Sequence, residues 1–160
     1  MVNKPMQQRI YIDTSVFGGC FDTEFEEPSK QLFQEFQQGL KTSVISNVTL
    51  LELERAPRNV RNLLKDIPEI YREHITLDQE ARNLAQHYVD EQVVSNKYLL
   101  DAQHIAMASI HRVDVLVSWN FKHIVNLRRI HLYNAVNLKY SYPMVEIRSP
   151  REVLNENKDI

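Results

Sequence analysis

The sequence predicts an α/β fold in which a largely parallel β-sheet is covered by helices on both faces. Three observations lead to this prediction. Short β-rich segments alternate with amphipathic segments along the chain, which is the pattern of strand–helix–strand units. The strand candidate DVLVS at 114–118 is apolar enough for a sheet buried on both faces. The segment 99–111 is apolar on nearly all sides, as expected of a buried helix.

Five segments are strand candidates, because they are short and rich in β-branched or aromatic residues. The first, RIYID, alternates in polarity and ends at Asp13, followed by the small residues Thr14 and Ser15. The last is followed by Pro150, which we expect to close the regular structure. The candidates are residues 9–13, 42–46, 74–77, 114–118 and 145–148.

Helices are expected between these strands. Pro28 opens an amphipathic run, Asn47 and Asp78 are placed to cap helices, and Pro57 separates two short helices. Apolar residues recur at helical spacing at Leu32, Phe33, Phe36 and Leu40, at Val60, Leu63 and Leu64, and at Ala81, Leu84, Ala85 and Tyr88. We expect helices at 48–56, 99–111 and 123–137, a loop or short helical turn at 16–27, a polar loop at 91–98, and loose ends at 1–7 and 151–160.

Composition and cysteine content exclude several classes of protein. The 160 residues fit one domain, residues 1–160, and a hydrophobic fraction of 43% is that of an ordinary globular chain. No apolar run approaches the ~18 residues of a membrane span, and no apolar stretch precedes the first strand candidate. Cys20 is the only cysteine, so an intrachain disulfide and a thiolate zinc cluster are excluded. We therefore expect no membrane contact, no secretory signal and a cytoplasmic location.

Acidic residues stand where the predicted strands end. Asp13 closes the first strand, and Ser118 and Asn120 follow the fourth. Glu52 lies on the helix after the second strand, and Asp101 lies in the first turn of the buried helix. Because ligands of parallel α/β sheets bind beyond the carboxyl ends of the strands, we expect these side chains to line one crevice.

Three carboxylates and one amide would form an oxygen-rich site. Clustered carboxylates repel one another and are costly to bury without a cation. Oxygen ligands suit Mg²⁺ or Mn²⁺ better than softer metals. Such ions activate a water for in-line attack on a phosphodiester and stabilise the leaving oxygen. The residue types therefore indicate metal-assisted phosphodiester hydrolysis.

Each acid also has a structural interpretation. Asp13 could cap the next turn, and Asp101 could be a charge favoured by the helix dipole. Glu52 and Glu54 both lie among leucines, and the apolar pattern alone does not decide which one faces the site. Asp101 is the clearest signal, because a charged residue seldom occurs in an apolar helix without a partner.

Four segments, in order, resemble the motifs of the PIN-domain family. They are IYIDTSVF at 10–17, ISNVTLLELERA at 45–56, LLDAQHIAMAS at 99–109 and DVLVSWNFKHI at 114–124. The second resembles the T-L-x-E-L motif, whose glutamate, an acidic ligand, corresponds to Glu52. The resemblance covers residues 8–148.

The resemblance implies a three-layer PIN-like sandwich with a five-stranded, mainly parallel sheet in the order 3-2-1-4-5. It also implies Mg²⁺- or Mn²⁺-dependent RNA cleavage with Asp13, Glu52 and Asp101 as catalytic metal ligands. Many such chains are homodimeric toxins that pair with a small antitoxin protein. One departure matters: the fourth acid of the family commonly falls at Asn120, whose amide can hold a metal-bound water but brings no charge.

Several neighbouring residues are candidates for supporting roles. Thr14 and Ser118 are placed to fix Asp13 or to bond metal waters, and His104 to bond a carboxylate or a phosphate. For His104 and His123 a structural role is favoured over a functional one. Trp119 could stack on a base, although packing is the commoner role at a strand end.

RNA binding would require locally gathered basic residues, because the net charge of the chain is −2. A basic stripe of Arg55, Arg58, Arg61 and Lys65 forms if helical geometry continues through Pro57. The stretch 115–145 contains Lys122, Arg128, Arg129 and Lys139 and no acid. Such stripes are usually solvated faces, but beside an acidic crevice they favour a phosphate track.

Two other functions fit the same pattern. One is a catalytically weak RNA-binding module, which the amide at Asn120 favours. The other is a receiver-like α/β protein in which a strand-end aspartate accepts a phosphoryl group. The glycines, at 18, 19 and 39, do not form a P-loop, and no lysine stands in an obvious partner position after a late strand.

Overall fold

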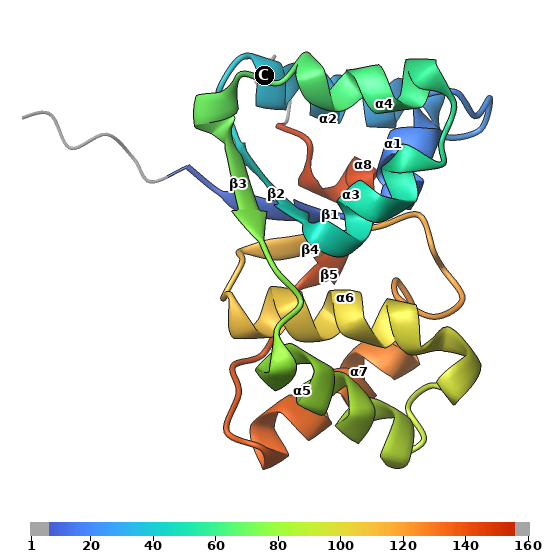
Figure 1. The fold of residues 1–160 in the computed structure, drawn as a ribbon, viewed down its shortest axis with the longest axis vertical. Helices are drawn as coiled ribbons and strands as arrows, with labels where there is room; N and C mark the ends of the chain where they lie inside the picture. Colours follow the sequence, from blue (N-terminus) through green and yellow to red (C-terminus); the bar gives the residue numbers. More distant parts are fainter. Residues whose placement is uncertain (1–6, 156–160) are drawn as a thin grey trace, which may run out of the picture.

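The computed structural model describes residues 7–155 and contains one parallel sheet with the strand order β3-β2-β1-β4-β5 (Figure 1). All four strand pairs are parallel, with Tyr11 opposite Val44 on one side and Leu116 on the other. The strands are β1 Arg9–Ile12, β2 Thr42–Ser46, β3 Arg72–Ile75, β4 Val115–Val117 and β5 Ile147–Arg148. The fold class and strand order predicted above are thus confirmed.

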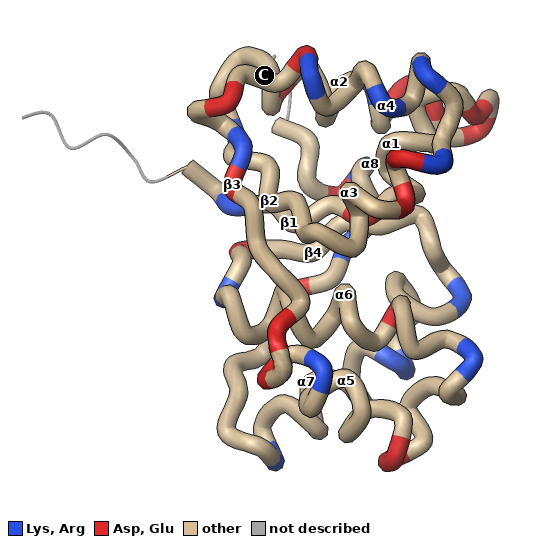
Figure 2. Tube along the Cα trace, in the orientation of Figure 1, with Lys and Arg blue, Asp and Glu red and all other residues tan. Residues whose placement is uncertain are grey.

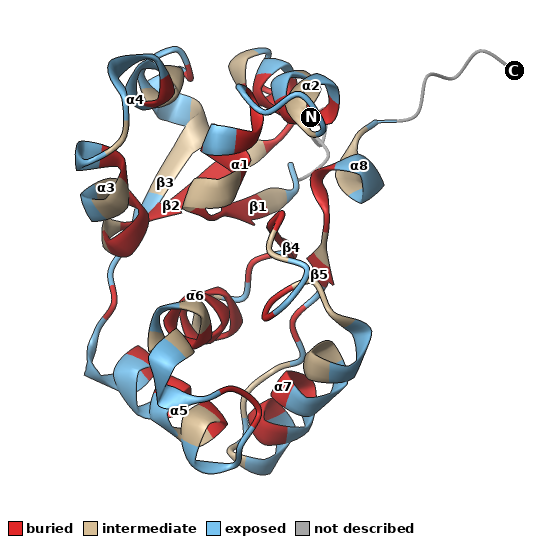
Figure 3. Cartoon of the chain, turned by 90° about the vertical axis from the view of Figure 1, so that its right-hand side faces the viewer, coloured by how far each residue is buried: buried red, intermediate tan, exposed pale blue. Residues whose placement is uncertain are grey.

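Helices cover both faces of the sheet. Helices α1 to α4 lie on one face, and α5 to α7 lie on the other (Figures 1 and 3). The helices are α1 Thr14–Gly19, α2 Glu26–Gln37, α3 Asn47–Glu54, α4 Arg58–Lys65, α5 Gln79–Asp90, α6 Leu99–Ile110, α7 Leu127–Lys139 and α8 Pro150–Val153, with 3₁₀ turns at Glu69–Tyr71 and Asn96–Tyr98.

Alternating residues of the central strand face two separate cores. Ile10 and Ile12 pack with the helices on one face, while Tyr11 packs with α5, α6 and α7 on the other. All three are completely buried. This follows from the twofold side-chain periodicity of a strand whose faces are both covered. Helix α6 is buried on almost every side, as its apolar composition predicts (Figure 3).

Local hydrogen bonds confirm some of the predicted helix ends and correct others. Asp78 caps α5, since its side chain accepts from the Ala81 N–H at 2.9 Å. Ser46, and not Asn47, caps α3; Asn47 is the first helical residue, and its side chain accepts from the Leu77 N–H. The prediction of Asn47 as the cap was therefore wrong. A serine at the end of a strand provides the same acceptor one residue earlier.

Several boundaries differ from the predicted ones. The expected loop after β1 contains the six-residue helix α1, and α2 begins at Glu26 and ends before Leu40. Strand β3 begins two residues early, at Arg72. Helix α7 begins only at Leu127, because the Asn126 side chain caps it by accepting from the Arg129 N–H.

The end of the chain is more ordered than expected. Pro150 begins helix α8 and does not close the regular structure. Ser149 and Glu152 form a capping box there, and proline suits the first helical position because its missing N–H is not needed. Of the ends expected to be loose, 1–6 and 156–160 lie outside the described residues. In the part of the chain that the structure describes, no helix is long and apolar enough to cross a membrane.

Candidate active site at the carboxyl end of the sheet

Asp13 directly follows β1 and is only 5% exposed. It occupies the position before α1, but its side chain makes no capping hydrogen bond to the backbone. Its carboxylate instead accepts from Ser15 Oγ at 2.5 Å and from Ser118 Oγ at 2.6 Å, one bond on each oxygen. Two hydroxyls from two elements therefore fix this carboxylate, which is not the arrangement of a helix cap.

The segment after β4 bonds Asp13 through Ser118 and carries Asn120 near Asp101. The Asn120 N–H donates to Ser118 Oγ at 3.0 Å. Asn120 Oδ1 accepts from the backbone N–H groups of Lys122 and His123, at 3.2 and 3.0 Å. The Asn120 side chain also lies near enough to Asp101 to oppose the rise in the pKa of that carboxyl. Asn120 thus shapes this turn and acts on the third acid from it.

Glu52 faces inward from α3, whereas Glu54 is exposed. The Glu52 side chain is 34% exposed, and its Oε1 lies 3.3 Å from His104 Nε2. Of the two acids that the sequence left open, Glu52 therefore packs toward the site, as the T-L-x-E-L resemblance favours.

A hydrogen-bonded chain connects Glu52 to the protein interior. His104 is 3% exposed, and its Nδ1 lies 2.5 Å from the Tyr11 hydroxyl, which donates to Ser46 Oγ at 2.8 Å. The hydroxyl has one proton, so when it donates to Ser46, His104 Nδ1 must donate to it. His104 is therefore a hydrogen-bonded core histidine that also contacts a carboxylate. Sequence analysis missed Tyr11 and Ser46; the signal was a tyrosine in a buried strand, whose hydroxyl needs a partner.

The three acids share one electrostatic field. Burial raises the pKa of Asp13, and the Glu52 charge adds to this, while His104 and the two serine hydroxyls oppose it. Burial also raises the pKa of Asp101, and the charges of Asp13 and Glu52 add to it, against His104 and Asn120. Each of these acids is thus within electrostatic range of the other two, and a bound cation would relieve the repulsion.

Glu52 behaves differently from the other two acids. Burial by itself would raise its pKa, but the hydrogen bond and the charge of His104, with a smaller effect of Thr14, hold the pKa below its ordinary value. The Thr14 hydroxyl is buried near this carboxylate without completing a hydrogen bond to any described residue. Glu52 is therefore the acid of the three whose pKa is shifted in favour of the ionised form.

The donor set suits Mg²⁺ or Mn²⁺, because carboxylate oxygens predominate in it. Among residues 7–155, however, no three His, Cys, Asp or Glu side chains are already spaced to hold a metal ion. The chemistry of the residues therefore fits a divalent ion, and their spacing would have to tighten when one binds.

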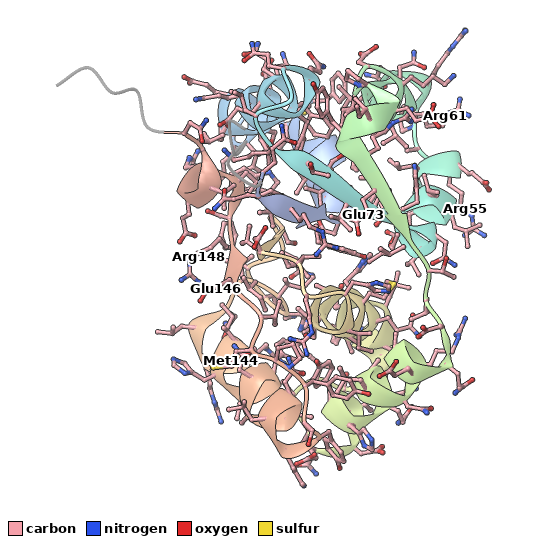
Figure 4. All side chains as sticks on the ribbon, turned by 90° about the vertical axis from the view of Figure 1, so that its left-hand side faces the viewer. Arg55, Arg61, Glu73, Met144, Glu146 and Arg148 are labelled. Carbon is pink, nitrogen blue, oxygen red and sulfur yellow. The ribbon has the colours of Figure 1, made fainter. Side chains whose placement is uncertain are left out.

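The predicted basic stripe is interrupted. Helix α3 ends at Glu54, Arg55 is its C-cap and Pro57 precedes α4, so helical geometry does not continue through Pro57. Arg58, Arg61 and Lys65 remain on α4 and are exposed. Arg55 and Arg61 lie along one side of the molecule, as Figure 4 shows. Charges of both signs occur in this helical layer, so it is not a uniformly basic face (Figure 2).

The remaining candidates have structural surroundings. Trp119 is 7% exposed, stacks on Phe25 at 4.1 Å between ring centroids and donates to Ser29 Oγ. His123 is buried and stacks on Tyr98 at 3.6 Å. These contacts favour packing over base stacking for Trp119 and a structural role for His123. Lys122 is exposed, with its ammonium 6.0 Å from the Tyr98 ring.

Comparisons with protein-family models and with curated proteins give no match. Solved structures do resemble the chain. A toxin–antitoxin complex from Klebsiella pneumoniae matches with a TM-score of 0.52 and 20% identity, over 71% of this chain and 88% of that one. VapC20 of Mycobacterium tuberculosis, a toxin that cleaves the sarcin–ricin loop, matches with a TM-score of 0.51 and 15% identity, over 71% and 92%. VapBC2 from Rickettsia felis, bound to a DNA fragment from its promoter, matches with a TM-score of 0.54 and 11% identity, over 89% and 98%.

These identities are low, so the likeness establishes the fold alone. The chain is an α/β protein with acidic residues gathered at the carboxyl ends of its parallel strands. More particularly, it has the PIN-like fold of toxin–antitoxin toxins, as its four motifs predict.

Proposed function

We propose that this chain is a metal-dependent endoribonuclease that hydrolyses RNA phosphodiester bonds. The observation that carries the proposal is the coupling of Asp13, Glu52 and Asp101 in one field at the carboxyl end of a PIN-like sheet. These carboxylates lie close together although the charge of one makes ionisation of its neighbours less favourable. Such an arrangement is expected of a site that binds a cation. A residue that only caps the next turn would bond the backbone of α1, whereas the Asp13 carboxylate is bonded by two serine hydroxyls.

Asp13, Glu52 and Asp101 would hold Mg²⁺ or Mn²⁺. When bound, the ion supplies an activated water and stabilises the leaving oxygen of the phosphodiester. Ser15 and Ser118 orient the two oxygens of Asp13. This fixes the lone pairs that face the site before any ligand arrives.

Two further residues position the other acids. His104 bonds Glu52 and so restricts its rotamers. Asn120 Oδ1 already accepts two backbone N–H groups, so we propose that its amide nitrogen holds Asp101 or a metal-bound water and that its oxygen is not itself a ligand. Asn120 then supports the site without adding charge to it.

Binding of RNA would use the exposed basic residues beside the acids. Arg55 follows directly on the helix that carries Glu52, and Lys122 directly follows the turn that carries Asn120. Arg58, Arg61 and Lys65 extend the first group along α4. We propose that these five residues contact backbone phosphates, which would make binding independent of sequence and dependent on salt.

We further propose that the chain is the toxin of a toxin–antitoxin pair, acts in the cytoplasm and forms a homodimer. Its structural likeness to toxin–antitoxin complexes supports a small antitoxin protein as a partner. Exposed apolar side chains on α7, Leu127 at 74% and Leu138 at 60%, offer surface for such protein contacts.

One alternative keeps support from the structure. A catalytically weak RNA-binding module fits the amide at Asn120 and the absence, among the described residues, of three acids already spaced for a metal. The receiver-like alternative fails, because receiver domains have the strand order 2-1-3-4-5 and this sheet has 3-2-1-4-5.

The experiment is cleavage of single-stranded RNA by purified protein with Mg²⁺ or Mn²⁺. EDTA should stop the reaction, and Asp13→Asn should lower kcat by two or more orders of magnitude while circular dichroism shows an intact fold. Asp90→Asn, a change of the same chemistry at an exposed position at the end of α5, is the matched control and should keep the wild-type rate. RNA binding without metal-dependent cleavage would favour the binding module.

A further inference from the structure

A pocket of about 390 Å³ adjoins the candidate active site between α3, α5 and α6. Small-molecule sites begin at roughly this size, ~300 Å³. Glu52 forms part of its wall, so the pocket and the acidic centre share a side chain. The exposed Glu54 also lines the pocket, which therefore holds two acids beside its two arginines. The other lining residues that matter here are Leu51, Arg55, Arg82, Leu100 and Gln103.

Two leucines give the pocket an apolar wall. Leu51 on α3 is 60% exposed and Leu100 on α6 is 45% exposed. A leucine that extends into solvent contributes nothing to the core, and a pair of them lining one concavity favours a ligand with an apolar face. The face of a nucleobase is such a surface.

Gln103 brings a hydrogen-bonding group to the same pocket. The residue is 8% exposed and lines the pocket. A polar group in a pocket wall can bond a ligand in place of water. An amide offers donors and an acceptor side by side, which matches the edge of a base.

Arg55 and Arg82 place two positive charges at the pocket. Both are exposed, and neither forms an ion pair with an acid in the described part of the chain. Guanidinium groups bind phosphate through paired N–H donors. Arg55 directly follows α3 and Arg82 lies on α5, so the two charges reach the pocket from different elements.

We propose that this pocket is a nucleotide subsite, occupied by the nucleotide next to the phosphate that is cleaved. Its base would lie against Leu51 and Leu100 with its edge on Gln103, and its phosphate would lie between Arg55 and Arg82. The volume suits one nucleotide, and the shared Glu52 places the adjoining phosphodiester at the acids. The inference rests on the proposed ribonuclease activity and gives that activity a preference for particular bases.

The first test uses metal-free protein, so that it does not depend on catalysis. The four nucleoside 5′-monophosphates are titrated while the Gln103 side-chain amide resonance is followed by NMR, with inorganic phosphate as the control. We expect the nucleotides to shift this resonance, with different Kd values for different bases, and inorganic phosphate alone to leave it in place. If none of the four nucleotides moves the resonance, the proposal is overturned.

The second test uses non-cleavable 2′-O-methyl RNA and variants of the pocket. Arg82→Ala should raise the Kd about tenfold, the loss expected for one charged hydrogen bond to phosphate. Gln103→Leu should equalise the Kd values of RNAs that differ at one base. Arg151→Ala, a change at an exposed arginine on α8 outside the pocket, is the matched control and should stay within about twofold of wild type.

The outcomes separate this inference from the proposed function. If Asp13→Asn abolishes cleavage but both pocket variants bind RNA like wild type, the nuclease stands and the subsite is refuted. If wild type fails to cleave RNA while nucleotides still shift Gln103, the nuclease is refuted and the pocket remains a nucleotide site. If Leu100→Ser changes the oligomeric state and the wild-type protein binds no nucleotide, the pocket wall is a protein interface and the proposal fails.

Discussion

Replacing Asp101 with asparagine tests whether this acid belongs to a cation site or holds the fold together. Asp101 lies in the first turn of α6, and burial and the charges of Asp13 and Glu52 raise its pKa. The folded, metal-free protein therefore disfavours the ionised carboxylate relative to the unfolded chain. The replacement amide would keep the shape of the side chain while removing the charge.

The sign of the effect follows from proton linkage. Because the folded pKa of Asp101 exceeds its ordinary value of 3.8, the folded state binds this proton more tightly than the unfolded state. The associated stability is fully present below pH 3.8 and is lost as the pH rises through the higher folded pKa. At neutral pH, metal-free Asp101→Asn should therefore melt above metal-free wild type, with a smaller loss of stability between acid and neutral pH.

The expected changes in folding stability are small without metal and larger with it. Asp101 is partly exposed, so solvent screening limits the relieved repulsion to about 0.5–1 kcal/mol. For a domain of this length that is a Tm increase of about 1–4 °C. In wild type, Mn²⁺ at ~100 times its Kd should add about 2.7 kcal/mol, or about 5–11 °C, because it binds the folded state alone. The variant should gain only a small part of this.

The assay is a comparison of four melting curves: wild type and variant, each with and without Mn²⁺ at neutral pH. The exposed replacement Asp90→Asn serves as the control and should respond to Mn²⁺ like wild type. If metal-free Asp101→Asn melts well below metal-free wild type, the favourable charge at the start of α6 dominates. Asp101 would then be structural, and the nuclease proposal would lose its clearest residue.

Three further changes test other parts of the structure. Asn120→Asp should lower the Mn²⁺ concentration for half-maximal cleavage, because it adds a charge beside Asp101; an unchanged concentration would place residue 120 outside the influence of the metal. Replacing Arg58 and Arg61 with Glu should weaken RNA binding and reduce the salt dependence of the binding constant by about one counterion for each lost contact. An unaltered salt dependence would show that these two residues only face solvent. Lys41→Ala should cost about 3–5 kcal/mol in urea unfolding, because it strands the buried Glu35 carboxylate 2.9 Å away; a loss near that of an exposed ion pair would contradict this.

The sequence predicts the central strands β1, β2 and β4 well because they are buried on both faces. A segment such as VLV at β4 must be apolar whichever strands it pairs with, so it can be recognised from its own residues. The order of the strands came from the motif resemblance, since periodicity says nothing about which strands pair. Helix ends were less predictable, because Ser46 and Asn47 are both good caps and only the turn decides between them.

Sequence patterns did not predict contacts between residues that are far apart in the chain. The Lys41 ammonium bonds Glu35 and also Asn155, 114 positions away, and nothing in the local sequence marks Lys41 as buried. The bond from Tyr11 to His104 spans 93 positions. Whether these groups meet depends on how α6 and the last segment pack, which is a property of the whole fold.

The three acids of the candidate site differ in the same way in how far the sequence could predict them. Asp13 was predictable in position and is also fixed in orientation, because it stands at the end of a central strand between two serines. Glu52 and Asp101 project from helices and are partly exposed, so the backbone determines which site they face but not their spacing. Sequence patterns therefore predicted which acids lie near one another at this end of the sheet. The distances that would make it a metal centre depend on two side-chain rotamers that only a bound cation would select, which is why binding of Mn²⁺ is the more direct test of the site.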